Sequence, residues 1–526
     1  MADGLERNTR TVMLFTALSR VTGLLRDATF SRVLGTSTAM SAFGFAFLIP
    51  NLFRRLFGEG ALSAAFLPTY QRLVERDEKQ AAALAGGMLG VLAVGLGMVV
   101  VLGESVLFLV SATYDHENMA VWLMMLTLPY TPLVCMVAII GAMLHVRGRF
   151  GPTASVPLVL NGCLIAAALL GWWFIGADTD RDRLLVTAIM SGTVVLAGVL
   201  QVGWSLLAMR GVAKLEFDFA AARDPLREIF RRAGPMILGL GVLQLNTLLD
   251  GIIASVPLWT DGQVLGYTYP LDDHSLAVLQ FAQRLYQFPL GVFGIAIATV
   301  IYPLLTKCAA EPGPFLSTVR RGVRLVLFIS VPAGVGLILV REPLTAVVLQ
   351  GGAFDAADTS RVAFVLLGYA TCIWAYMLGQ ILTRAFYARD EVRTPVRIAM
   401  AMVTLNLILN LILIWPLREA GLAWSTALCA VIQSVLMAVI LHRRGVPIFN
   451  DVVLGTLVRV VIAAAIMAAC IGAVLWAWPA SPSWWGELAR LAVLTLVGGI
   501  VMSVFAITLR MPELRWVFGI SDADKE

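Results

Sequence analysis

The chain has 526 residues, of which 59% are hydrophobic and only 14% are charged. Soluble domains average about 25% charged residues, so this composition excludes an ordinary soluble protein and indicates one that crosses a membrane many times. The formal net charge of +5 is small, and no nucleic-acid partner is predicted.

Apolar segments long enough to cross a bilayer recur along the whole chain, about fourteen in number. The predicted spans fall at about residues 11–34, 38–70, 82–112, 119–145, 153–176, 185–209, 233–257, 276–306, 323–349, 361–387, 395–416, 420–441, 455–478 and 487–510. The polar N-terminus lacks the short apolar core of a cleaved signal peptide, so we expect the first span to direct insertion. Six cysteines stand singly, which predicts neither a disulfide framework nor a zinc site.

Basic residues gather in alternate loops. The segment 210–232 carries six of them, and loops on the same side of the membrane hold most of the others. The opposite loops contain few basic residues and include acidic segments such as Y-D-H-E-N at Tyr114–Asn118. Cytoplasmic loops are enriched in lysine and arginine, so the pattern predicts that both termini are cytoplasmic.

A weak internal repeat divides the chain. H-V-R-G-R-F-G-P-T at His145–Thr153 resembles Y-A-R-D-E-V-R-T-P at Tyr387–Pro395, and each precedes a span that contains an asparagine, Asn161 or Asn406. Repeated halves are a transporter architecture, with the substrate site between the halves. We therefore predict an all-α membrane protein with two six-helix lobes and two extra C-terminal helices. The predicted domains are residues 1–215, 216–446 and 447–526.

Charged residues lie inside several of the predicted spans. They are Arg20, Arg26, Asp27, Arg54, Arg55, Glu59 and, in the second half, Arg284. A charge at the centre of a membrane helix costs roughly 2.5–3.5 kcal/mol, so such residues face a protein interior or a watery cavity. Pro50 and Pro289 interrupt the two helices that carry Arg54 and Arg284, because proline removes a backbone hydrogen bond.

Arginine is well suited to a ligand that carries phosphate. Its planar fork binds phosphate oxygens in pairs and stays charged at any relevant pH. The predicted ligand-facing residues are Arg20, Arg26, Arg54 and Arg284, with Asp27 and Glu59 beside them. The alternative is structural: Arg26–Asp27 and Arg55–Glu59 form local ion pairs, and Arg32 extends outward to the interface.

Four motifs carry a family resemblance. They are S-R-V-T-G-L-L-R-D-A at Ser19–Ala28, A-F-L-I-P-N-L-F-R-R-L-F-G-E-G at Ala46–Gly60, R-L-Y-Q-F-P-L-G at Arg284–Gly291 and L-Q-G-G-A-F-D at Leu349–Asp355. They resemble the MurJ (MviN) family, the lipid II flippases of peptidoglycan synthesis, which belongs to the MOP superfamily with the MATE exporters.

The resemblance implies two six-helix lobes around a cationic central cavity and a C-terminal helix pair whose groove takes the prenyl tail. The family's essential arginines fall on Arg20, Arg26, Arg54 and Arg284. The implied substrate is an undecaprenyl-pyrophosphate-linked disaccharide-pentapeptide, moved across the bacterial inner membrane by alternating access. Membrane lipids and cell-wall synthesis proteins are further expected partners.

The chain departs from the family pattern at two acidic positions. Ser41 stands where the family commonly has Asp early in the second helix, and Gln283 stands where it has Asp before the arginine of the eighth. The cavity should therefore be more positive than usual. The loop at about Leu258–Ser275 also looks longer than in the family.

A second polar cluster suggests an ion site. Its members are Asp250, Asn406, Asn410 and Thr426. Their oxygens suit a hard cation, and some members of the family have a sodium site of this kind, so Na+ is a candidate coupling ion. The alternative is ordinary hydrogen bonding between helices.

Other functions remain open on the residues alone. One is a flippase for another polyprenyl-linked glycan or a MATE-like exporter, although four inward arginines disfavour cationic drugs. Another is a membrane glycan polymerase, and a third is a scaffold without transport activity. No G-x-x-x-x-G-K-[ST] segment occurs, so the chain carries no such ATPase motif, and we predict a transporter rather than an enzyme.

Overall fold

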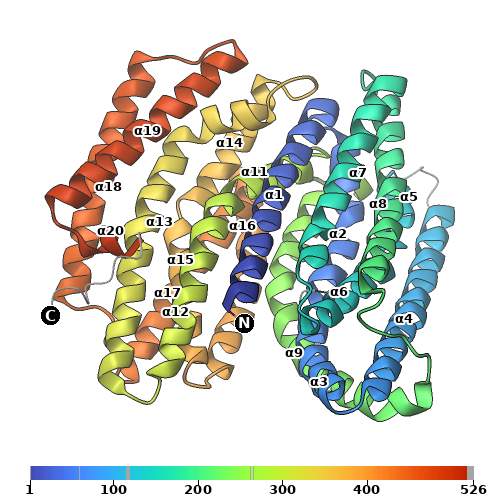
Figure 1. Ribbon diagram of the computed structural model, residues 1–526. Helices are drawn as coiled ribbons and strands as arrows, with labels where there is room; N and C mark the ends of the chain where they lie inside the picture. Colours follow the sequence, from blue (N-terminus) through green and yellow to red (C-terminus); the bar gives the residue numbers. More distant parts are fainter. Residues whose placement is uncertain (1, 59, 114–118, 261, 265, 518–526) are drawn as a thin grey trace. The chain divides into compact units, whose positions relative to one another are not determined.

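The computed structural model describes residues 2–58, 60–113, 119–260, 262–264 and 266–517, and they form two compact units built almost entirely of helices (Figure 1). The first unit comprises Met1–Ala277 and the short turn Gly351–Phe354, and the second comprises Val278–Gln350 and Asp355–Glu526. Glu59, one of the predicted site residues, lies outside the described residues.

The first unit contains these elements in order: α1 (Ala2–Leu34), α2 (Thr38–Phe53), the π-helix η1 (Arg54–Gly58), α3 (Ala61–Arg76), α4 (Glu78–Thr113), α5 (Met119–Thr127), α6 (Tyr130–Val146), α7 (Gly151–Ile175), α8 (Asp180–Met209), α9 (Phe219–Ser255), α10 (Pro257–Thr260), β1 (Gln263–Val264) and β2 (Tyr267–Thr268). Helix α7 packs against α1 and α8, and α9 packs against α3 and α4. The two strands form an antiparallel hairpin within the long loop that the sequence indicated.

Helix α11 (Ser275–Pro289) begins in the first unit and continues into the second. The second unit then contains η2 (Leu290–Gly294), α12 (Ile295–Lys307), α13 (Pro312–Leu349), α14 (Ala356–Ala370), α15 (Ile373–Tyr387), α16 (Arg393–Leu417), α17 (Glu419–Arg443), α18 (Asp451–Ala477), α19 (Trp484–Thr508) and α20 (Pro512–Val517). The all-α membrane class is thereby confirmed. The predicted lobe boundaries at 215/216 and 446/447 rest on the repeat and stay a prediction.

Ten helices or helix pairs within the described residues are long and apolar enough to cross a membrane. They match ten of the fourteen predicted spans, so the count of fourteen is not confirmed. The other four predicted spans are helical as well. Three of them do not meet the length and composition expected of a single membrane-spanning helix. Helix α1 carries several charges, and the segments 38–70 and 276–306 are each divided by a π-helix.

Proline determines where both π-helices occur. Pro50 lies inside α2 shortly before η1, and Pro289 ends α11 directly before η2. Proline cannot donate its backbone hydrogen bond, and π-helical turns often occur at functional sites. The prediction that a proline interrupts the span that carries Arg54 and the span that carries Arg284 is confirmed.

The turn Gly351–Phe354, from the L-Q-G-G-A-F-D motif, packs on the end of α1. The backbone N–H of Ala353 donates to the carbonyl of Arg32 at 2.8 Å. Gly352 has φ +59°, and a Cβ there would collide with the Arg32 carbonyl. Glycine is needed at this position because any side chain would be strained and would also lose the close contact.

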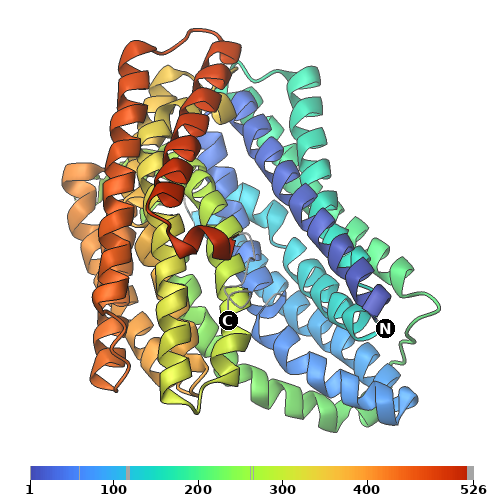
Figure 2. The same ribbon diagram turned by 60° about the vertical axis from the view of Figure 1, so that its left-hand side comes forward.

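The C-terminal helix pair packs along α13 (Figures 1 and 2). Met467, Ile471 and Leu494 form a buried cluster against Val335 and Leu339 of α13. This apolar contact makes α18 and α19 part of the second unit.

A buried ion pair fixes the short helix α20 on the same unit. Glu513 is only 1% exposed and accepts hydrogen bonds from Arg324 Nε at 2.7 Å and Thr456 Oγ1 at 2.9 Å. The guanidinium groups of Arg321 and Arg324 lie over the ring of Trp516, 4.6 and 4.9 Å from its centroid. Residues from α13, α18 and α20 are thus joined in one polar cluster.

Candidate functional site

Arg20 and Arg26 lie on α1 in different surroundings. Arg20 is exposed, whereas Arg26 is largely covered. Arg26 Nη2 and Nε donate to Asp27 Oδ1 at 2.6 and 3.0 Å, and its guanidinium lies 5.7 Å from the ring centroid of Phe30. The local ion pair between Arg26 and Asp27, which the sequence offered as the structural alternative, is therefore present, and the ligand-facing role of Arg26 stays a prediction.

A second acceptor binds the other terminal nitrogen of the Arg26 guanidinium. Arg26 Nη1 donates to Asn161 Oδ1 of α7 at 3.0 Å. The sequence marked Asn161 only as a feature of the repeat and assigned it no role. A signal was available, because it is the one asparagine in the predicted span 153–176.

Arg54 and Arg55 stand side by side at the start of η1, and both are partly buried. Arg54 Nε and Nη2 donate to Asn51 Oδ1 at 3.1 and 2.9 Å. Arg55 Nη1 donates to Gln244 Oε1 of α9 at 3.0 Å. Neither Asn51 nor Gln244 was predicted. A carboxamide oxygen thus accepts a hydrogen bond from each of three guanidinium groups, those of Arg26, Arg54 and Arg55.

Arg284 lies on α11 in the second unit and is exposed. Its neighbour Gln283 donates from Nε2 to Tyr369 Oη at 3.1 Å, and the ring of Tyr286 stacks on that of Tyr369 at 4.4 Å. The amide at position 283 is therefore part of a structural contact with α14, where the family commonly has an acid.

Ser41, the other departure from the family pattern, is fully buried in α2. Its Oγ accepts a hydrogen bond from the backbone N–H of Ala277 at 3.1 Å. That N–H belongs to the first turn of α11, where backbone donors have no partner within the helix. Ser41 therefore caps α11.

The predicted sodium ligands fall in both units. Asn406, Asn410 and Thr426 form one hydrogen-bonded group in the second: Asn406 Nδ2 donates to Thr426 Oγ1 at 3.3 Å, and Asn410 Nδ2 donates to Asn406 Oδ1 at 3.1 Å. Both asparagines are fully buried, and Asp250, on α9 of the first unit, is 3% exposed. Neutral oxygens and one carboxylate fit a hard cation, and the helix-to-helix bonds of the alternative are present too. The ion site stays a prediction.

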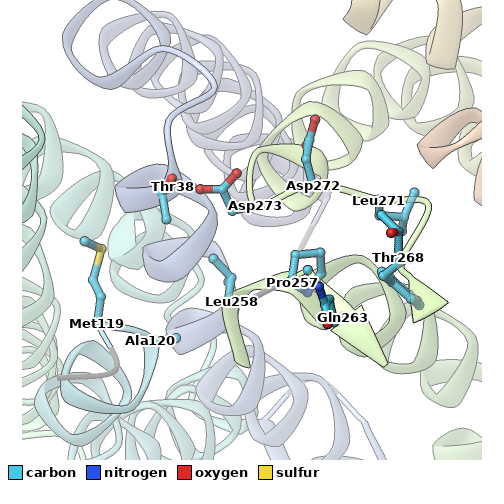
Figure 3. Close-up of a pocket in the computed structure, with 12 residues that line it drawn as sticks. Thr38, Met119, Ala120, Pro257, Leu258, Gln263, Thr268, Leu271, Asp272 and Asp273 are labelled. Atoms are coloured by element: carbon cyan, nitrogen blue, oxygen red, sulfur yellow. Dashed lines mark hydrogen bonds between the residues drawn. The ribbon is translucent and has the colours of Figure 1, made fainter. Parts of the chain in front are cut away.

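A cavity of about 590 Å³ lies where α2, α5 and the long loop of the first unit meet (Figure 3). Thr38 points toward Asp273 and donates to it, while Asp272 accepts from the backbone N–H of His274 and from Ser275 Oγ at the start of α11. Tyr269 donates to the carbonyl of Ile253 at 3.0 Å, and burial raises the pKa of Tyr269 to about 12. None of the predicted site residues lines this cavity.

Comparison with known proteins decides the family. The family described as "Lipid II flippase MurJ" matches residues 30–486. The chain is 31% identical to the probable lipid II flippase MurJ of Vibrio cholerae, with 96% of each chain covered. It is 29% identical to the lipid II flippase MurJ of Burkholderia cenocepacia, with 83% of each covered.

The chain belongs to the MurJ family. Its fold agrees: a solved MurJ structure in an inward closed conformation superposes with a TM-score of 0.76 at 22% identity, covering 95% of this chain and 99% of that one. An inward-facing MATE transporter of the MOP superfamily superposes with a TM-score of 0.66 at 13% identity, covering 83% and 97%. The resemblance to the MurJ family is confirmed, and the fold is shared with a MATE transporter of the MOP superfamily.

Proposed function

We propose that this protein is a lipid II flippase, which moves the undecaprenyl-pyrophosphate-linked peptidoglycan precursor from the inner to the outer leaflet. The observation that carries the proposal is family membership over most of the chain, including the segments that hold Arg54 and Arg284. Arginines inside membrane helices, of which Arg26 and Arg54 are partly buried, suit a polyanionic headgroup because charge-assisted bidentate bonds to phosphate are strong.

Arg20, Arg26, Arg54 and Arg284 bind the pyrophosphate and the adjoining sugar in this proposal. Asp27 orients Arg26 through their ion pair, and Glu59 stands in the same motif as Arg54. Asn51 and Gln244, which accept from Arg54 and Arg55, support the forks with neutral oxygens. The headgroup would enter from the cytoplasmic side and leave on the other by alternating access of the two halves.

The prenyl tail would stay in lipid along α18 and α19. Both helices expose large apolar side chains, among them Val458, Ile462 and Ile500. Such apolar side chains pack favourably against acyl chains, so the prenyl tail would follow this surface without entering the polar interior.

The driving energy would come from the membrane potential, an ion gradient or consumption of the substrate outside. A potential negative inside favours outward movement of anionic headgroups by about 2.3 kcal/mol per charge per 100 mV. Sodium bound by Asp250, Asn406, Asn410 and Thr426 is the candidate coupling ion.

The protein lies in the bacterial inner membrane as a multi-pass protein, and we place both termini in the cytoplasm on the distribution of basic residues. Cell-wall synthesis proteins are the expected neighbours. The protein acts as a transporter rather than as an enzyme in this proposal.

Complementation tests the proposal. The wild-type chain should restore growth to a strain depleted of its lipid II flippase, and Arg20→Ala or Arg284→Ala should abolish that growth at normal protein level. Failure of the wild-type chain, at normal level in the membrane, would count against the function. Full growth of both arginine variants would count against the proposed site.

A further inference from the structure

Asn161 of α7 is buried against α1, with 5% of its surface exposed. Its carboxamide spans two turns of that helix. The oxygen Oδ1 accepts from Arg26 Nη1 at 3.0 Å, and the nitrogen Nδ2 donates to Thr22 Oγ1 at 3.1 Å and to the Ser19 carbonyl at 3.4 Å. Both ends of one amide are therefore used on the same neighbouring helix.

Gly23 is the residue of α1 that faces this amide. A Cβ at Gly23 would lie 3.7 Å from Asn161 Nδ2, which is ordinary van der Waals contact, whereas a longer side chain would reach the amide itself. The small residue lets α7 approach closely, as small residues do between membrane helices. The chain thus brings a neutral acceptor to an arginine in a low-dielectric setting.

The bonds to Arg26 leave part of its fork available. A guanidinium has five N–H donors. Within the described residues, Asp27 takes two of them and Asn161 takes one. One donor therefore remains on each terminal nitrogen for a ligand oxygen.

The neutrality of the acceptor matters as much as its position. Asp27 already supplies one negative charge to Arg26 at 2.6 Å. A second carboxylate at position 161 would give the cluster a net negative charge and repel an anionic headgroup. Asparagine holds the fork without adding charge, and its N–H₂ group fixes the amide on α1.

We propose that Asn161 is a positioning residue for lipid II binding, which holds the Arg26 fork in the orientation that receives the pyrophosphate. This inference rests on the proposed function. It adds a residue on α7 to a site that the sequence placed on the first, second and eighth spans only.

A double-mutant cycle on the purified protein in nanodiscs, with lipid II itself as the probe, tests the proposal. Asn161→Ala should weaken binding by about five- to twentyfold, because a hydrogen bond to a charged group is lost while the arginine remains. The Arg26→Ala/Asn161→Ala double variant should bind no more weakly than Arg26→Ala alone, because Asn161 acts through Arg26. Equal losses from Asn161→Ala in both backgrounds would overturn the proposal.

Asn161→Asp provides a second test with nearly unchanged volume, and it serves even if the alanine variant does not fold. It keeps an acceptor for Arg26 but adds a charge, so binding should be weaker than in the wild-type protein. Wild-type affinity in this variant would overturn the claim that the acceptor must be neutral.

Gln201→Ala is the matched control. Gln201 of α8 is 1% exposed, accepts from Tyr130 Oη at 3.2 Å and donates to the Val156 carbonyl at 2.9 Å, with no arginine in these bonds. It should lower the melting temperature without changing lipid II affinity. A wild-type protein that binds no lipid II would contradict the proposed function, whereas normal binding by both wild type and Asn161→Ala would contradict only the role of Asn161.

Discussion

Arg26 in the first unit and Arg324 in the second are covered to nearly the same degree, with 13% and 16% of their side chains exposed. Their acceptors differ. Arg26 is held by Asp27, its neighbour on the same helix, and by the neutral amide of Asn161. Arg324 is held by Glu513, which is distant in sequence and shares its carboxylate with Thr456.

The difference shows that burial alone does not distinguish a binding arginine from a structural one. The carboxylate of Glu513 is almost fully buried and needs Arg324, because a buried charge without a partner is costly. The Arg26 fork keeps one donor on each terminal nitrogen within the described residues. Donors remain on the Arg324 guanidinium as well, so the two arginines differ in their acceptors and not in their spare donors. Arg324 neutralises a buried carboxylate and stabilises the contact of α20 with α13 and α18, whereas Arg26 is held in part by a neutral amide.

The largest difference is expected between the single variants Arg26→Ala and Arg324→Ala, because one removes a binding group and the other a structural one. Arg26→Ala should abolish complementation of a flippase-depleted strain at normal protein level, because the headgroup loses a charged fork. Arg324→Ala should act mainly by lowering the amount of folded protein. Growth assays with quantitative membrane immunoblots measure both. Wild-type growth of Arg26→Ala would contradict its binding role, and an inactive but fully stable Arg324→Ala would contradict its structural role.

Removing the acceptor Glu513 should also cause a large loss of stability. Glu513→Ala leaves Arg324 without its carboxylate partner, and breaking a buried pair costs about 3–5 kcal/mol. Chemical or thermal unfolding of the purified protein, followed with a probe in α20, measures the loss. Glu342→Ala is the control: its pair with Arg341 at 3.6 Å is exposed and should contribute less than about 1 kcal/mol. Equal effects of the two variants would contradict the structural role.

Asp250 is a third kind of buried charge, since its proposed partner is an ion. Asp250→Asn removes the only carboxylate of the candidate sodium set and should abolish any sodium dependence of transport. Lipid II transport in liposomes with and without a sodium gradient measures it. Unchanged sodium dependence would leave the Asn406–Thr426 group as a purely structural contact.

The smallest effect is expected at a surface pair. Although partial burial opposes it, hydrogen bonds from Arg444 and Thr394 lower the pKa of Glu391. A lowered carboxyl pKa stabilises the folded state above the pKa of the unfolded chain, and this contribution is lost as pH falls through the folded value. Glu391→Gln should therefore cost about 0.2–1 kcal/mol near pH 7, and this cost should shrink as pH falls through the lowered pKa of the folded state. A penalty independent of pH would show that charge plays no part.

The sequence predicted the helical membrane class and the proline breaks before both π-helices, and it offered the ion pair of Arg26 with Asp27 as the structural alternative to a ligand-facing role. It could not predict Asn161 or Gln244 as partners, whereas Asn51 was overlooked although it lies three residues before Arg54, a spacing at which helical side chains meet. Sequence spacing does not determine which faces of α1, α7 and α9 meet, and a lone amide in an apolar span has many uses. Ser41 and Gln283 were recognised only as missing acids, and the structure shows each in a specific hydrogen bond.

In the proposed function, Arg20, Arg26, Arg54 and Arg284 bind a lipid-linked pyrophosphate and pass it across the membrane. The most direct measurement is the appearance of labelled lipid II in the outer leaflet of liposomes that contain the purified protein. We expect protein-dependent transfer by the wild type, none by Arg26→Ala, and reduced transfer by Asn161→Ala. No transfer by correctly folded wild-type protein, or equal transfer by wild type and Arg26→Ala, would contradict it.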